Sequence, residues 1–121
     1  MKPPLCDYSN CKNLGIYKVV FRPNKTIIEM VFLTKDVTNE KNKGFFKIPD
    51  DIVLVDCATH IEYNLLSTSN VLLYPKKNYY FNSGIVIKFQ LIFKPMNVIT
   101  NPFDLVSKSK GILIKRINVT S

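Results

Sequence analysis

The only histidine and all three cysteines of this chain fall into two close pairs. Cys6 and Cys11 form one pair and Cys57 and His60 the other, which gives the pattern C-x4-C-x45-C-x2-H. Structural zinc sites are closed tetrahedra of four thiolate or imidazole ligands. These four residues are a complete ligand set of that kind, so the sequence predicts one structural Zn2+ ion. The alternative interpretation is that the cysteines are free thiols or small buried side chains and that His60 lies in solvent.

One short helix is expected at the second pair. Asp56 is a residue type that caps helix N-termini. The apolar residues that follow recur at spacings near three and four: Ala58, Ile61, Leu65 and Leu66. We therefore expect a helix that begins at Cys57 and ends within residues 67–70. Residues three apart share a helix face, so Cys57 and His60 are expected to point the same way.

This arrangement resembles the treble-clef class of zinc fingers. In that class a knuckle supplies two ligands, a β-hairpin follows, and the first turn of a helix supplies the other two. Cys6 and Cys11 stand at the knuckle positions, and Cys57 and His60 at the helix positions. The resemblance covers residues 5–69 and implies a structural zinc, because four protein ligands leave no position for a catalytic water.

The remainder of the chain is expected to be β-structure. Residues 16–21 and 26–33 are rich in β-branched and aromatic residues, and the turn-forming residues 22–25 between them predict a β-hairpin. Further strands are expected at residues 52–55, 71–74, 79–81, 84–93 and 111–119. The polar residues 35–44 predict an exposed loop.

The predicted fold class is therefore α+β, mostly β with one short helix, in a single domain of residues 1–121. Its two parts are a zinc-stapled, treble-clef-like half at residues 1–69 and a basic β-rich half at residues 70–121.

Positive charge is concentrated in the second half. The chain has 17 Lys and Arg against 9 Asp and Glu, a net charge of +8. Residues 63–121 hold eight of the cations and only one acid, Asp104, which leaves +7 in that part. This distribution favours an anionic partner, either nucleic acid or an acidic protein surface.

Lysines alternate with aromatic rings around residues 74–81, a composition that suits single-stranded nucleic acid because bases stack on rings while lysines meet phosphates. The predicted nucleic-acid contacts are Lys76, Lys77, Tyr79, Tyr80, Lys108, Lys110, Lys115 and Arg116. Two alternatives stay open. The tyrosines can pack a core beneath solvated lysines, or the chain can be a protein–protein interaction or virion component anchored by Tyr79, Tyr80, Phe81 and Phe89.

A second resemblance involves the middle of the chain. Residues 63–67, Pro75 and residues 83–87 are similar in spacing to the first part of deoxyuridine triphosphatases, and residues 105–114 are similar to their next motif. Asn64 stands where the first motif has Asp, and Phe103-Asp104-Leu105 replaces an Arg-Ser-Gly-Leu run. The resemblance therefore implies a non-catalytic, all-β relative in which residues 63–67 form a strand.

The sequence predicts a binding protein that is not an enzyme and has no small-molecule substrate. No G-x-S-x-G, P-loop or G-x-G-x-x-G motif is present. Apolar stretches are too short to span a bilayer, and the N-terminus lacks the apolar region of an export signal. We expect no membrane partner and a cytoplasmic location. The Lys-, Asn- and Ile-rich composition would suit a phage or virus, in which case the location is the host cytoplasm or the virion.

Overall fold

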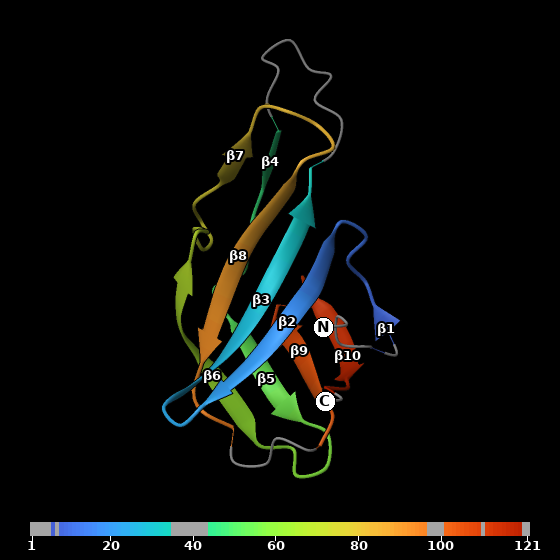
Figure 1. Ribbon diagram of the computed structural model, residues 1–121, viewed down its shortest axis with the longest axis vertical. Coiled ribbons are helices and arrows are strands. Elements are labelled where there is room, and N and C mark those ends of the chain that lie inside the picture. Colours follow the sequence, from blue (N-terminus) through green and yellow to red (C-terminus); the bar gives the residue numbers. More distant parts are fainter. Residues whose placement is uncertain (1–5, 7, 35–43, 97–100, 110, 120–121) are drawn as a thin grey trace.

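The computed structural model describes residues 6, 8–34, 44–96, 101–109 and 111–119 (Figure 1). All regular secondary structure within these ranges is β. The strands are β1 Tyr8–Ser9, β2 Leu14–Arg22, β3 Lys25–Leu33, β4 Gly44–Phe46, β5 Ile52–Asp56, β6 Glu62–Ser69, β7 Asn78–Tyr80, β8 Val86–Phe93, β9 Phe103–Ser107 and β10 Leu113–Ile117. The ranges contain no helix long and apolar enough to cross a membrane.

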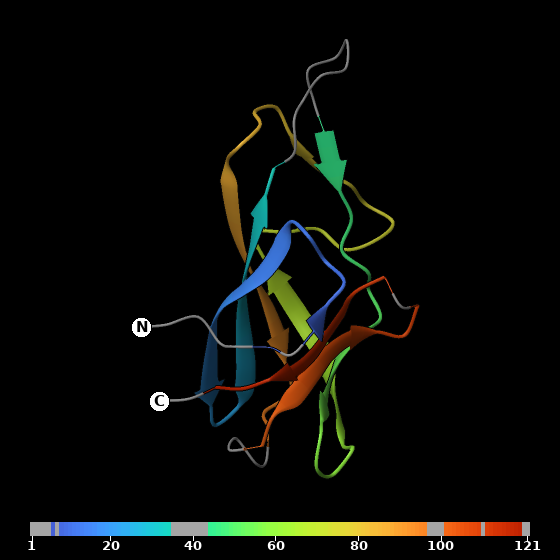
Figure 2. The same ribbon diagram turned by 90° about the vertical axis from the view of Figure 1, so that its right-hand side faces the viewer.

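Eight strands form one antiparallel sheet in the order β1-β10-β9-β5-β6-β8-β3-β2, and β4 pairs with β7 in a second, two-stranded sheet. The large sheet is strongly curled, so that β2, β3 and β8 lie in front of β5 and β9 (Figures 1 and 2). The bend is at β6, whose first residues pair with β5 and whose last residues pair with β8, with a register shift between Leu65 and Ser67. A bulge of this kind increases local twist and lets one strand serve both parts of the sheet.

The predicted hairpin is confirmed. β2 and β3 pair antiparallel around a turn at Pro23 and Asn24, with Arg22 opposite Lys25. Along β3 the buried side chains are Thr26, Ile28, Met30 and Phe32. Strand β8 pairs with the other side of β3 over eight residue pairs. The large sheet therefore contains strands from both sides of residue 69 in the chain.

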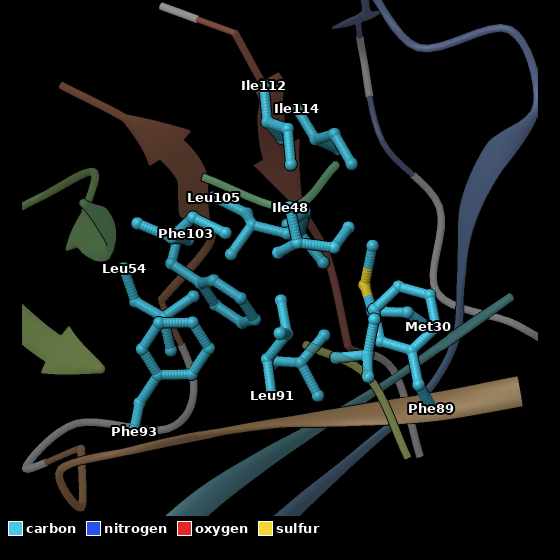
Figure 3. Packing of buried hydrophobic residues seen from close by; sticks show 14 of the residues in the cluster. Met30, Ile48, Leu54, Phe89, Leu91, Phe93, Phe103, Leu105, Ile112 and Ile114 are labelled. Atoms are coloured by element: carbon cyan, nitrogen blue, oxygen red, sulfur yellow. The ribbon is translucent and has the colours of Figure 1, made fainter. Parts of the chain in front are cut away.

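The core lies inside the curl (Figure 3). Its centre is formed by side chains from β5, β8 and β9 that have no more than 1% of their surface exposed: Leu54, Leu91, Phe93, Phe103 and Leu105. Complete burial of an aliphatic or aromatic side chain contributes about 1.5–3 kcal/mol, so this cluster is the main source of stability.

The α+β prediction is wrong, because the segment expected to be helical forms a turn and a strand. Residues 57–59 are the turn between β5 and β6. The N–H of His60 donates to the carbonyl of Asp56 at 2.8 Å, and the N–H of Asp56 donates to the carbonyl of Ile61 at 2.9 Å. His60 has a φ of 62°, which a continuing right-handed helix does not allow.

The apolar spacing was misleading at this position. Two of the four residues in the expected helical stripe, Ile61 and Leu66, are 44% and 53% exposed, whereas Tyr63 is buried. Leu65, two residues after Tyr63, packs against the core, because side chains of a strand alternate between its two faces. Pairing with two neighbouring strands outweighed a weak helical pattern.

The remaining predictions of strands and of a loop are confirmed in part. The strands expected at 52–55, 79–81, 84–93 and 111–119 correspond to β5, β7, β8 and β10. Within 71–74 only Leu73 pairs, in an isolated bridge to Ile48. Of the expected loop, residues 35–43 lie outside the described residues, and Gly44 begins β4.

Candidate nucleic-acid interface

The structure does not bring the four predicted zinc ligands together. Cys57 and His60 lie at the β5–β6 turn, where the N–H of Cys57 donates to the carbonyl of Pro102. Cys6 and Cys11 line a cavity of about 160 Å3 that is also lined by residues of β2 and β10. No group of three or more His, Cys, Asp or Glu side chains in the described ranges is placed to hold a metal ion.

The thiol pKa values of Cys11 and Cys57 are both raised. All three are free. Burial raises the pKa of the Cys57 thiol, and the Asp104 carboxylate, whose Oδ1 accepts a hydrogen bond from Sγ at 3.4 Å, raises it further. Burial also raises the pKa of Cys11, against a smaller lowering effect of a backbone hydrogen bond at Leu113. Both groups are therefore neutral thiols at neutral pH.

A different cluster stands out on the two-stranded sheet. In β4 and β7, Phe45 lies opposite Tyr79, Gly44 opposite Tyr80, and Phe46 opposite Asn78. Side chains alternate between the two faces of a strand. Phe45 and Tyr79 accordingly point outward, with 48% and 51% of their surface exposed, while Tyr80 is buried.

The inward side chains attach this small sheet to the large one. The Phe46 ring stacks on Phe32 of β3 with centroids 4.1 Å apart and an angle of 18° between planes, and it lies 6.2 Å from Phe89 of β8. Tyr80 lies 5.9 Å from Phe32. A Cβ on Gly44 would be 2.5 Å from the Tyr80 ring, so only glycine leaves room for Tyr80 at this place.

The outward residues form what we call the aromatic–lysine platform, defined as Phe45, Lys47, Tyr74, Lys77 and Tyr79. The Phe45 and Tyr79 rings meet edge to face with centroids 6.3 Å apart. The Nζ of Lys77 lies 4.5 Å from the Phe45 centroid. The Nζ of Lys47 lies 6.0 Å from the Phe45 centroid and 5.6 Å from that of Tyr74. The two cations thus lie over the Phe45 and Tyr74 rings at cation–π distances.

Hydrogen bonds fix the loop that carries Tyr74 and Lys77. The Asn78 Oδ1 accepts from the N–H of Leu72 at 2.7 Å, and Asn78 Nδ2 donates to the carbonyls of Leu72 at 2.9 Å and Phe46 at 3.3 Å. The N–H of Tyr74 donates to the carbonyl of Ile48 at 2.7 Å. The loop is therefore held against the chain that follows β4, and the platform is ordered before any ligand binds.

The local charge around the platform is positive. Residues 44–49 and 70–81, which carry the platform, contain three lysines and no Asp or Glu. Lys76, next to the platform, is exposed. Focused positive potential of this kind attracts polyanions.

The other predicted contacts lie elsewhere in the fold. The Lys108 Nζ is 3.5 Å from Glu62 Oε1, just after β9. Lys115 and Arg116 belong to β10, where the N–H of Arg116 donates to Asp104 Oδ1 at 2.8 Å. Lys110 is outside the described residues. The structure thus separates Lys76, Lys77 and Tyr79 from the C-terminal cations.

Sequence reasoning missed Phe45 and Lys47 as members of this cluster, and it included Tyr74 in the basic and aromatic segment without naming it as a contact. Phe45 belongs to β4 and Lys47 directly follows it, about thirty residues before β7 in the chain. Only the pairing of β4 with β7 brings them to Tyr79. A basic and aromatic composition at residues 44–47, similar to that at 74–81, was the available signal.

Protein-family models, curated proteins and solved structures contain no match to this chain. The treble-clef prediction is wrong, since the described residues contain neither its helix nor its metal cluster. The resemblance to deoxyuridine triphosphatases gains no support from these comparisons, and an all-β fold is only weakly compatible with it.

Proposed function

We propose that this protein binds single-stranded nucleic acid on the aromatic–lysine platform, as a non-catalytic component of a nucleoprotein assembly. The observation that carries the proposal is the cross-strand pair Phe45 and Tyr79, half exposed and edge to face, with Lys77 Nζ 4.5 Å from the Phe45 ring. The proposal includes a cytoplasmic location, or the virion for a viral chain, which the free thiols favour.

The physical basis is the energetics of exposed rings beside lysines. Stacking of one base on an aromatic side chain contributes about 1–3 kcal/mol and tolerates any base, since every base has a π-face. In the complex a base takes the place of Lys77 above Phe45, and the lysine turns to the neighbouring phosphate. Because Asn78 and the Phe46–Phe32 stack hold the platform in place, little ordering entropy is lost on binding.

The test is fluorescence anisotropy with a labelled oligo(dT) over a salt series. For single strands the slope of log K against log salt is about −0.7 per neutralised phosphate, so Lys47→Ala combined with Lys77→Ala is expected to flatten the slope by about 1.4. Phe45→Ala with Tyr79→Ala is expected to weaken binding by about tenfold or more and to leave the slope unchanged.

Matched controls are available on other elements. Tyr8→Ala removes a 53% exposed ring from β1, and Lys94→Ala removes an exposed cation after β8. Both control variants are expected to bind like the parent protein. If the platform variants bind no worse than these controls, the proposal is wrong.

A second candidate is a protein–protein interaction or a virion structural role. The last residues of β3 and the first of β8 lie at the same end of the molecule as β4 and β7 (Figure 1). Exposed apolar side chains come from these strand ends and from the segments that flank β7: Leu33, Leu72, Phe81, Ile85 and Val86. Leu33 and Val86 are directly opposite each other in the β3–β8 pair. Clusters of this kind favour a protein partner. Of the anchors expected from sequence, Phe81 is 65% exposed, whereas Tyr80 and Phe89 are buried.

A further inference from the structure

We infer a second binding surface at the edge of the large sheet: strand β2 accepts an extended peptide with alternating acidic and apolar residues, which pairs with it as an added strand. Among the residues that the structure describes, the large sheet ends at β2 on one side and at β1 on the other. β2 has nine residues, whereas β1 has two. β2 is therefore the long edge on which a strand can be added.

The opening beside β2 is apolar and has room for a side chain. The cavity of about 160 Å3 between β2 and β10 is lined by Leu14, Ile16, Ile114 and Ile117, together with Cys11. β2 and β10 are not paired with each other, because β10 lies between β1 and β9 in the sheet and β2 pairs with β3. An aliphatic side chain from a strand paired to β2 would be buried in this cavity, and pockets for alternate side chains are how strand addition gains specificity.

The charge at this edge selects the chemistry of the partner. Strands β1, β2 and β10 contain four cations and no acid: Lys18, Arg22, Lys115 and Arg116. The nearest acid on the neighbouring strand, Glu29 opposite Lys18, accepts a hydrogen bond from Gln90 at 3.1 Å. A second copy of β2 would bring further cations to this edge, while glutamates on an incoming strand would meet opposite charge.

The bulge in β2 defines the part that pairs. The β2–β3 register shifts between Ile16 and Lys18. At the shift, the Nζ of Lys88 lies 4.8 Å from the centroid of the Tyr17 ring. From Lys18 to Arg22 the pairing with β3 is regular. A regular segment at an edge presents its outer backbone N–H and C=O groups at the spacing that a strand needs. The peptide therefore pairs regularly with Lys18 to Arg22, and its residues beyond the bulge reach Leu14 and Ile16 beside the cavity.

The test uses a fluorescein-labelled, nine-residue peptide of alternating glutamate and valine, matching the nine residues of β2. One control peptide has lysine in place of glutamate, and another has a central proline, which removes a ladder hydrogen bond. The acidic peptide is expected to bind at least about tenfold more tightly than either control, as charge and pairing both require. Hydrogen exchange is expected to show new protection at amides of residues 18–22.

A charge-reversal variant completes the design. Lys18→Glu with Arg22→Glu is expected to weaken peptide binding by about tenfold or more, while Lys94→Glu, at an exposed position after β8, is expected to have no effect. Circular dichroism verifies that each variant is folded. Oligo(dT) is expected not to compete, because the platform lies on β4 and β7.

Three outcomes would overturn the inference: equal binding of all three peptides, protection outside β2, or displacement of the peptide by oligo(dT). A dimer in sedimentation velocity, with β2 amides protected before any peptide is added, would overturn it too, because the edge would then be covered by a second copy.

Discussion

Replacing Asp56 by Ala tests whether the turn that replaced the expected helix is a main determinant of stability. Asp56 has 0% of its surface exposed. Its Oδ1 accepts hydrogen bonds from the N–H groups of Ala58 at 2.8 Å and Thr59 at 2.9 Å. Asn101 Nδ2 lies at the longer distances of 3.4 Å and 3.3 Å from the two carboxylate oxygens.

The magnitude follows from these bonds. Hydrogen bonds to a charged group contribute about 1.5–3 kcal/mol each. Ala58 and Thr59 are exposed, so their N–H groups regain water in the variant, and the lower value applies to the two short bonds. We expect Asp56→Ala to lower the free energy of unfolding by about 3 kcal/mol. This change is measured by urea unfolding with tyrosine fluorescence as the signal, since the chain has six Tyr and no Trp.

The pH dependence provides an independent check. Burial alone would raise the pKa of the Asp56 carboxyl, but the hydrogen bonds from Thr59, Ala58 and Asn101 more than offset it and hold the pKa below its usual value. A carboxyl with a lowered folded-state pKa stabilises the protein above its unfolded pKa of about 3.9, and that stability is lost as pH falls through the folded value. The difference between parent and Asp56→Ala should be complete above about pH 5 and shrink below about pH 4.

The matched control is Asp50→Ala, at an exposed position before β5, for which we expect a change within about 0.5 kcal/mol. Asp56→Asn keeps one acceptor and should fall between the parent and the Ala variant. A parent-to-Ala difference that is the same at pH 3 and pH 7 would show that the ionised carboxylate does not stabilise the turn.

Three further outcomes are expected. Gly44→Ala places a Cβ against Tyr80 and should cost about 1–3 kcal/mol in urea unfolding while weakening oligo(dT) binding; parent-like values for both would contradict the proposed anchoring of β4. Leu91→Ala, at a site with 0% exposure, should cost about 2–5 kcal/mol. Cys57, whose pKa burial and Asp104 raise, should react with iodoacetamide at neutral pH more slowly in the folded protein than in urea.

Local patterns were sufficient for the β2–β3 pair of neighbouring strands, but not for β5–β6, where a helix was expected. The β2–β3 hairpin was predictable because two β-branched runs flank a Pro23-Asn24 turn, and the pairing needs no information from elsewhere. The Asp56 carboxylate was recognised as a cap from sequence, and it does accept N–H groups at +2 and +3. The same bonds form in a helix start and in a tight turn, so the cap alone could not distinguish the two.

The zinc prediction failed because zinc ligands must lie close together in the fold, whereas the sequence gives only their separation along the chain. Cys57 lies beside Asp104 of β9, while Cys11 lies near β10 and β2. Those positions depend on the order of the strands in a sheet where most pairings join distant segments. By residue type the four predicted ligands form a complete zinc set, yet the two pairs lie at different places in the fold.

The proposed role of β7 in nucleic-acid binding depends on which of two adjacent tyrosines faces outward. Composition treated Tyr79 and Tyr80 alike. Strand β4 determines that Tyr80 is the buried tyrosine, because Gly44 leaves room for the Tyr80 ring and Phe46 stacks on Phe32. A shift of β7 by one residue would exchange the faces, bury Tyr79 and separate it from Phe45. Gly44 therefore lies outside the proposed contact surface and still determines it, which is why Gly44→Ala is expected to lower stability and nucleic-acid affinity together.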